Sequence, residues 1–358
     1  MFRLPSGTDP QLALGRPTLG DLRTVTYGGL RIDKTYSLQH LNLDIVATRS
    51  RYNTFTHLDF DGVDYRGTWD WKFTPRWSGA LTLERVEAPV QYADFRSFQR
   101  NVRVTTNQEA SLDYWAFGGW HLLGGITEKE QKSEVDFLAE TDFRVVGPDA
   151  GIKYEWPSGS SLALKQHARR GENTRRELDP VNLIDTAFRD TETELVLSWR
   201  VSGPSTIDAR LARYERRNDH FSQRDFSGPV GGVTWSWIAT GKLRLVAAAK
   251  RELMPSSDSL SSYRVNNSIT LTPSLQMTEK TSVRLVLERI DSDFRGPVVT
   301  PTGPLRHDVL HTTTLAVDWV ATRKLTVNAV LQRQTRTANT PGADYEATTA
   351  TLSAGLVW

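Results

Sequence analysis

Charged side chains occupy alternate positions in several short segments of this 358-residue chain. Between Glu194 and Arg200, charged or small residues alternate with Leu195, Leu197 and Trp199. Successive side chains of a β-strand point to opposite faces, so such a segment has one apolar face and one face that carries charge. A face with charges of both signs stays hydrated and can pass a hydrated sugar chain through many weak contacts.

The same alternation predicts a set of residues that would line a translocation path. For each of them a second interpretation stays open, in which the residue belongs to a solvated interior whose charges satisfy one another. The candidate residues are Asp64, Arg66, Asp70, Lys72, Asp113, Lys153, Glu155, Lys165, His167, Arg169, Glu192, Glu194, Arg200, Asp208, Arg210, Arg244, Lys250, Arg284, Glu288 and Asp318.

Arginines gather near one end of several of these segments, and their guanidinium groups suit carboxylates and phosphates. Three kinds of partner fit: an anionic polymer, lipopolysaccharide, or only neighbouring Asp and Glu side chains. Nucleic acid is excluded as a partner, because 44 Lys and Arg against 42 Asp and Glu leave a net charge of only +2. The arginines are Arg96, Arg100, Arg103, Arg169, Arg170, Arg175, Arg176, Arg213, Arg216 and Arg217.

Seven histidines raise the question of an enzyme. His307, Asp308 and His311 lie at the start of a predicted strand, where a serine or aspartate from a neighbouring strand could complete a hydrolase site. No spacing in the sequence marks a nucleophile, a zinc site or a phosphate loop. We therefore predict no enzyme activity, no cofactor and no metal, with an outer-membrane hydrolase as a remaining alternative.

The elements that position these residues repeat about every 40 residues. Each period contains one short turn with a long strand on either side, whereas a propeller would need four short strands in each period. The predicted turns are Lys34–Thr35, Thr74–Arg76, Gly118–Gly119, Ser158–Ser160, Ser202–Ser205, Thr240–Lys242, Thr278–Lys280 and Thr322–Lys324. Longer polar loops, such as 170–189 and 293–308, join one period to the next.

The last segment, Tyr345 to Trp358, shows most clearly what kind of strand this is. Leu352, Ala354 and Leu356 share one face, small or polar residues share the other, and a tryptophan ends the apolar face. Alternation of this kind is typical of a transmembrane β-strand, although a soluble sandwich strand also alternates. No apolar run approaches the roughly 18 residues of a membrane helix, so a helical membrane protein is excluded.

Two further features favour a membrane barrel over a soluble sandwich. Short turns alternate with long loops, as in outer-membrane barrels. Nearly all tryptophans lie within a few residues of the short turns, which predicts a girdle at a lipid interface, where an indole ring is half buried and its N–H stays wet. The predicted girdle consists of Trp69, Trp71, Trp77, Trp120, Trp156, Trp199, Trp235, Trp237, Trp319 and Trp358.

The strand count predicts an incomplete start. Eight turns join sixteen strands, and Tyr345 to Trp358 adds a seventeenth that would meet Arg23 to Asp33 in parallel. Antiparallel closure needs one more strand, so we predict an all-β transmembrane antiparallel barrel of about 18 strands whose first strand is truncated. Residues 1–20 would hold its remnant and a loop, and residues 21–358 one barrel domain. The start also lacks a signal peptide, and the absence of cysteines excludes disulfides.

Three stretches carry a resemblance to a known family: Thr18 to Asp33, Asp70 to Trp77, and Asp113 to His121. They resemble the EpsL-type outer-membrane proteins of exosortase-associated exopolysaccharide clusters, which fall within a broader group of β-barrel porins. The resemblance covers most of the chain and implies an outer-membrane conduit that acts with a periplasmic export partner and an inner-membrane synthesis complex. Its motifs are structural turns and strands, so they identify the barrel better than the cargo.

The predicted function is therefore export of an extracellular polysaccharide through the bacterial outer membrane. The expected partners are membrane lipid and lipopolysaccharide, the polysaccharide cargo, and a periplasmic export lipoprotein. Three alternatives remain: a general or sugar-uptake porin, an outer-membrane hydrolase on a barrel scaffold, and a soluble β-repeat binding module.

Overall fold

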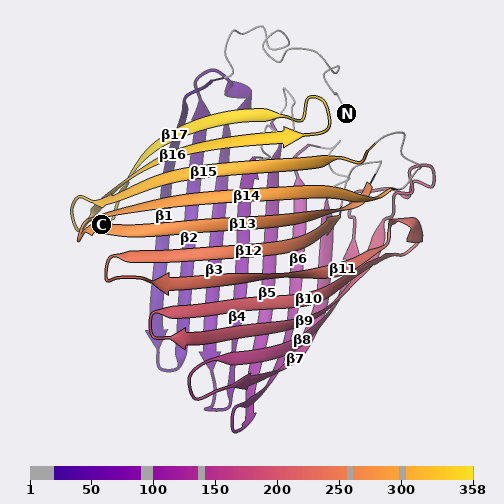
Figure 1. Ribbon diagram of the computed structural model, residues 1–358, viewed down its shortest axis with the longest axis horizontal. Coiled ribbons are helices and arrows are strands. Elements are labelled where there is room, and N and C mark those ends of the chain that lie inside the picture. The colour runs from indigo at the N-terminus through magenta and orange to yellow at the C-terminus, as the bar shows by residue number, and fades with distance from the viewer. Residues whose placement is uncertain (1–19, 90–99, 136–141, 256–260, 298–303, 358) are drawn as a thin grey trace. The chain divides into compact units, whose positions relative to one another are not determined.

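The computed structural model describes residues 20–89, 100–135, 142–255, 261–297 and 304–357, which form long β-strands joined by turns and loops (Figure 1). The strands are β1 (Arg23–Tyr36), β2 (Gln39–Tyr52), β3 (Phe60–Lys72), β4 (Trp77–Pro89), β5 (Val102–Phe117), β6 (Trp120–Ser133), β7 (Phe143–Glu155), β8 (Ser161–Glu172), β9 (Ala187–Ser202), β10 (Ser205–Asn218), β11 (Phe226–Ile238), β12 (Leu243–Pro255), β13 (Ser261–Thr278), β14 (Thr281–Pro297), β15 (His307–Val320), β16 (Leu325–Ala338) and β17 (Tyr345–Leu356).

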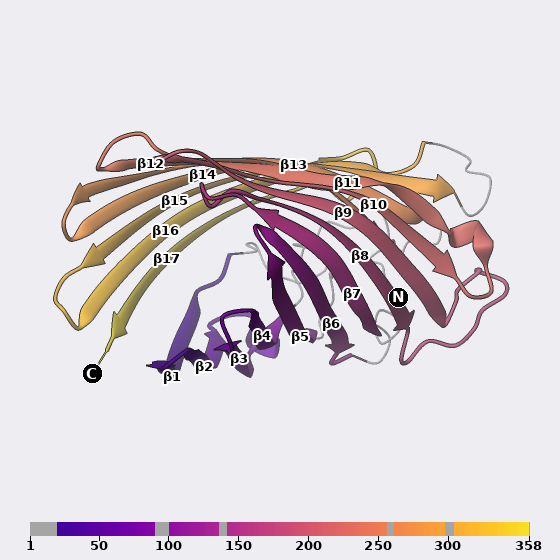
Figure 2. The same cartoon turned by 90° about the horizontal axis from the view of Figure 1, so that it is seen from below.

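The seventeen strands of the described residues belong to one sheet. Consecutive strands pair antiparallel from β1 to β6 and from β11 to β17. The chain divides into two compact units. The first contains β1 to β6 with adjoining parts of β7 to β10, and the second contains β11 to β17 with the remaining parts. Within each unit consecutive strands lie side by side (Figures 1 and 2).

The prediction of an all-β antiparallel fold is confirmed, and so are the seventeen strands that begin after residue 20. The eighteenth strand was expected before residue 20, outside the described residues. The strands are longer than predicted, because charged residues that were expected in loops continue the ladders. A loop was expected over residues 293–308, for example, but Asp293 belongs to β14 and pairs with His307 of β15.

Short turns and long connections alternate, as predicted. Four of the short turns have a threonine whose hydroxyl accepts a hydrogen bond from the backbone two residues later: Thr74, Thr240, Thr278 and Thr322. The prediction of a turn at Lys34–Thr35 was wrong. Both residues belong to β1 and pair with residues of β2. The chain reverses at Ser37–Leu38, where Ser37 has a φ of +54°.

One group of strands is built twice. β10, β11 and β12 begin and end at residue numbers 166 higher than β2, β3 and β4. The contacts recur as well: the Trp69 indole donates to Gln39 at 2.8 Å, and the Trp235 indole donates to Ser205 at 2.9 Å. The residues that are identical at this offset include Asp59 and Asp225, Phe60 and Phe226, Trp71 and Trp237, Thr74 and Thr240, and Arg85 and Arg251.

Few large side chains of the described residues are buried, because the apolar residues of the strands lie on an exposed face of the sheet. Leu211 is 65% exposed, Ile269 64% and Leu352 78%. These residues alternate along their strands with polar residues of the opposite face, as the sequence predicted. Among the described residues, no helix is long and apolar enough to span a membrane.

Candidate functional site

The polar face of the first unit carries charges that meet across neighbouring strands. Arg31 of β1 and Asp44 of β2 stand opposite each other in register and form an ion pair. His40 of β2 lies between two carboxylates, 2.9 Å from that of Asp33 and 3.5 Å from that of Asp70. Polar side chains therefore contact one another across β1, β2 and β3 on this face.

A second cluster on this face joins three strands. Asp113 of β5 accepts a hydrogen bond from Lys153 Nζ of β7 at 2.5 Å, and His121 Nδ1 of β6 lies 2.5 Å from its other oxygen. All three side chains are at most one quarter exposed, at 25% for Asp113, 21% for Lys153 and 17% for His121. The carboxylate thus bonds both neighbouring side chains, one through each oxygen.

The polar face of the second unit is built in the same manner. Arg210 of β10 donates to Glu194 of β9 at 2.5 Å, and the Ser198 hydroxyl donates to Asp208 at 2.8 Å. Farther along the sheet, the Asn328 amide donates to Asp318 at 2.7 Å. Paired charges and amides give a wet face without a strong field of one sign.

The internal repeat distinguishes residues that both copies share from residues that occur in only one copy. Trp69 and Trp71 recur as Trp235 and Trp237, so these aromatic positions belong to the shared framework. The charged residues of β3 do not recur, because Asp64, Arg66, Asp70 and Lys72 correspond at the same offset to Val230, Gly232, Ser236 and Ile238. Since the hairpin folds with either set, the β3 charges are not needed for its backbone structure.

Alternation and strand register place the predicted lining residues together on the polar face within each unit. In the first unit these are Asp64, Arg66, Asp70, Lys72, Asp113, Lys153, Lys165, His167, Arg169 and Glu192, and in the second Glu155, Glu194, Arg200, Asp208, Arg210, Arg244, Lys250, Arg284, Glu288 and Asp318. Their role as a translocation path remains a prediction. The sequence reasoning missed Arg31, Asp33, Asp44 and Glu84, which the same parity count would have found.

The opposite face carries exposed leucines and isoleucines, with tryptophans near the short turns. Trp77, Trp199 and Trp319 are between 43% and 49% exposed, and the indoles of Trp235 and Trp237 stack at 5.6 Å. An indole that is half exposed and hydrogen-bonded suits a lipid interface. The girdle remains a prediction, and one member, Trp358, lies outside the described residues.

Several loop-end arginines have carboxylate partners. Arg175 Nε donates to the fully buried Asp142 at 2.8 Å, and Arg170 and Arg189 lie 3.0 and 3.7 Å from the carboxylate of Asp219. Arg100 hydrogen-bonds Glu134 and thereby holds the pKa of that carboxyl below its ordinary value. Neighbouring acids therefore account for these arginines, one of the three expected alternatives. Arg96 lies outside the described residues.

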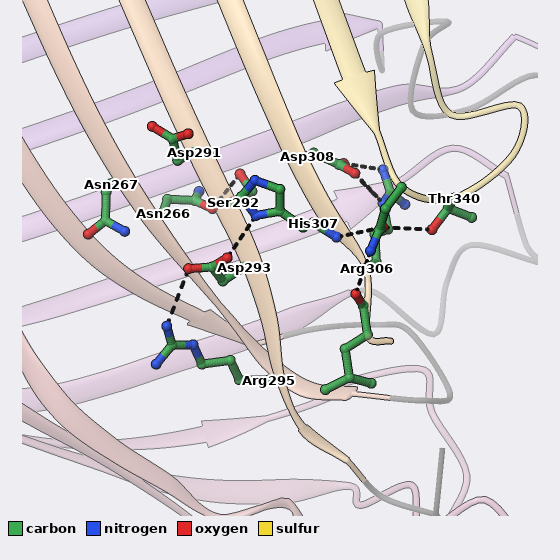
Figure 3. Close-up of polar contacts among 12 residues, drawn as sticks. Asn266, Asn267, Asp291, Ser292, Asp293, Arg295, Arg306, His307, Asp308 and Thr340 are labelled. Atoms are coloured by element: carbon green, nitrogen blue, oxygen red, sulfur yellow. Dashed lines mark hydrogen bonds and ion pairs between the residues drawn. The ribbon is translucent and has the colours of Figure 1, made fainter. Parts of the chain in front are cut away.

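His307 of the hydrolase alternative begins β15 and lies beside the polar end of β14 (Figure 3), whereas His311 lies farther inside β15. His307 Nδ1 lies 2.8 Å from Asp293, whose carboxylate also accepts a hydrogen bond from Arg295 at 3.3 Å. Ser292 points to the other face of β14, and its hydroxyl donates to Asn266 at 2.9 Å. A histidine and an aspartate are thus present, but this serine is not placed to act as their nucleophile.

No protein-family model and no curated protein matches the sequence. Solved structures do match it. The FrpB iron transporter from Neisseria meningitidis has a TM-score of 0.54 at 10% identity, over 93% of this chain and 65% of that one. The copper transporter OprC has a TM-score of 0.50 at 10% identity, over 92% and 65%. The chain thus spans about 65% of the length of these transporters.

A third similar structure is Pseudomonas aeruginosa OccK2 in complex with glucuronate, with a TM-score of 0.50 at 13% identity, over 94% of this chain and 92% of that one. At such identities the likeness shows the fold. The predicted EpsL-type family is not established by these matches and stays a prediction. The fold and the expected membrane are confirmed: this chain has the architecture of the β-barrels of the bacterial outer membrane.

Proposed function

We propose that the protein is an outer-membrane channel that exports an extracellular polysaccharide, and that it works with a periplasmic export lipoprotein and a synthesis machinery. The polar face would line the water-filled interior of the barrel, and the apolar face would meet lipid. The observation that supports the proposal is the pairing of opposite charges across strands on the polar face, as in Asp113 with Lys153 and Glu194 with Arg210.

Paired charges suit a polymer that must keep moving. A face of one sign would hold an oppositely charged chain at many points and slow its exit, whereas compensated charges offer many weak hydrogen bonds to sugar hydroxyls. The repeat supports a functional role for these charges, since the second copy of the hairpin folds without the charges of β3.

A second candidate is uptake of small sugars. It is favoured by one observation, that a barrel of the same fold, OccK2, has been solved with glucuronate. The two functions differ in the length of sugar that passes, because an export channel must admit a polymer and an uptake channel needs to admit only a short solute.

The test is reconstitution of the full chain in planar bilayers and in vesicles. We expect steady ion conductance, and efflux of neutral glucose oligomers longer than ten units from loaded vesicles. Efflux of mono- and disaccharides alone would favour uptake, and vesicles that retain all sugars with no ion conductance would overturn both channel proposals. A variant with Asp113→Ala and Glu194→Ala leaves cations without their carboxylates and should shift ion selectivity toward anions.

A further inference from the structure

A hollow of about 440 Å³ lies on the polar face of β13 to β16, within the second unit. Four strands contribute to it, so it is part of the sheet surface rather than of a loop. Its lining is rich in hydroxyl and amide groups and contains one cation and one anion. The lining residues are Thr272, Arg284, Val286, Glu288, Thr312, Thr314, Ala316, Val330 and Gln332.

The strand register arranges these residues in rows across the sheet. Glu288 stands opposite Thr312, Val286 opposite Thr314, and Arg284 opposite Ala316. Strand residues rise about 3.3 Å each, so Arg284 and Glu288 are held about 13 Å apart along β14. Between the two charges lies a neutral strip that includes Val286 and Thr314.

The two charges of the hollow are not compensated by a neighbouring charge among the described residues. Within the described part of the chain, neither Arg284 nor Glu288 has an ion-pair partner, whereas Glu194 is paired with Arg210 and Asp113 with Lys153. They do not form an ion pair with each other either. One hydrogen-bond donor group and one acceptor group are therefore available at opposite ends of the strip.

The floor of the hollow contains a hydroxyl that lacks a partner. Thr312 is only 6% exposed, and among the described residues its Oγ1 has no hydrogen-bond partner. A buried hydroxyl without a partner is costly, so it indicates a group that a bound molecule would satisfy. Glu288 of β14 stands opposite Thr312 in register, so a molecule bound in the hollow could contact both residues.

We propose that this hollow is a binding subsite for one or two units of a neutral sugar chain, an inference that rests on the proposed export function. Sugar hydroxyls would donate to Glu288, accept from Arg284, and bond to Thr312 and to the Gln332 amide. The apolar C–H face of a ring would rest on Val286 and its aliphatic neighbours. With one cation and one anion, the site has no preference for an anionic sugar.

The experiment measures interruptions of the ion current through single channels when maltohexaose is added. We expect Glu288→Gln to shorten each blocked interval about tenfold, because a bond to a charged acceptor is lost. Thr312→Val should shorten it about fivefold. The matched control is Thr313→Val, whose side chain lies on the opposite face of β15, and it should leave the blocked time unchanged.

A thermal unfolding curve of each variant separates binding from folding. Thr312→Val removes a hydroxyl that has no partner, so its unfolding temperature should not fall, and the shorter block then reports lost binding. Normal efflux of glucose oligomers with blocked times equal in all variants would overturn the subsite but not the channel. Block by oligogalacturonate alone, abolished by Arg284→Gln, would also overturn it and indicate an anion site.

Discussion

The carboxylate of Asp185 holds His220 by both its backbone and its ring. Asp185 Oδ2 accepts the His220 N–H at 2.5 Å, and Oδ1 lies 2.9 Å from His220 Nδ1. The repeat contains a simpler version of this contact, in which Asp21 accepts the N–H groups of Thr54 at 2.9 Å and Phe55 at 2.8 Å. The same loop is thus held by a carboxylate in both copies, and the second copy adds an imidazole.

This contact predicts how the loop responds to acid. Burial raises the pKa of Asp185, but hydrogen bonds from His220 and from neighbouring backbone N–H groups outweigh it and lower the pKa below its ordinary value. Stability from such a group is present above the unfolded pKa of about 3.9 and is lost as the pH falls through the lower folded value. We expect residues 219–225 to stay protected at pH 5 and to open below about pH 4.

Hydrogen exchange, corrected for the intrinsic effect of pH, measures this opening. Asp185→Asn should expose residues 219–225 already at neutral pH, while Asp21→Asn, the matched variant in the first copy, should expose only residues 53–59. Opening of the wild-type loop already at pH 6 would contradict the prediction, because the Asp185 carboxylate that holds the loop is still ionised at that pH.

The strands were predictable because alternation is a local signal, and each short turn carries its own turn residues. The misplaced turn at Lys34–Thr35 shows where this fails: the chain turns at Ser37, a non-glycine residue with positive φ that no local pattern marks. The polar face followed from parity alone. The side-chain pairs on that face could not be predicted. Asp113 and Lys153, for example, lie 40 residues apart and meet only because of how the strands between them pair.

The two faces of β13 should respond oppositely to a new charge. Ile269 is 64% exposed on the apolar face, and Thr270 is its neighbour on the polar face. We expect Ile269→Arg to lower the free energy of unfolding in lipid vesicles by about 2–4 kcal/mol, because the charge must enter the hydrocarbon layer. Thr270→Arg should leave stability nearly unchanged and alter only ion selectivity. Equal losses in both variants would mean that Ile269 does not face lipid.

The tryptophan girdle predicts a particular depth in the bilayer. Trp69 and Trp235 hydrogen-bond residues at the start of the preceding strands, Gln39 and Ser205. In variants that retain only one of these tryptophans, the tryptophan fluorescence should be quenched most strongly by lipids brominated near the headgroups, because indoles prefer that region. A variant with its single tryptophan at Leu211, in the middle of β10, should be quenched most by bromine near the chain ends. Strong deep quenching of Trp69 would rule out the girdle.

Gly171 lies against a buried aromatic ring whose position it determines. Phe188 is 3% exposed, and a Cβ added at Gly171 would come within 2.1 Å of that ring. The Arg216 guanidinium lies 3.6 Å from the centre of the same ring, and it also bonds both oxygens of Asp190 at 2.7 Å. A displaced Phe188 would therefore disturb a charged pair that is itself mostly buried.

We expect Gly171→Ala to lower the free energy of unfolding by about 1–3 kcal/mol, the usual cost of overpacking, as measured by urea unfolding in vesicles. Gly124→Ala is the matched control, because nothing lies within 4 Å of a Cβ added there. Alanine restricts the unfolded chain more than glycine does, so the control should be neutral or slightly more stable than the wild type. If the two variants unfold alike, close packing of Phe188 on Gly171 does not contribute to stability.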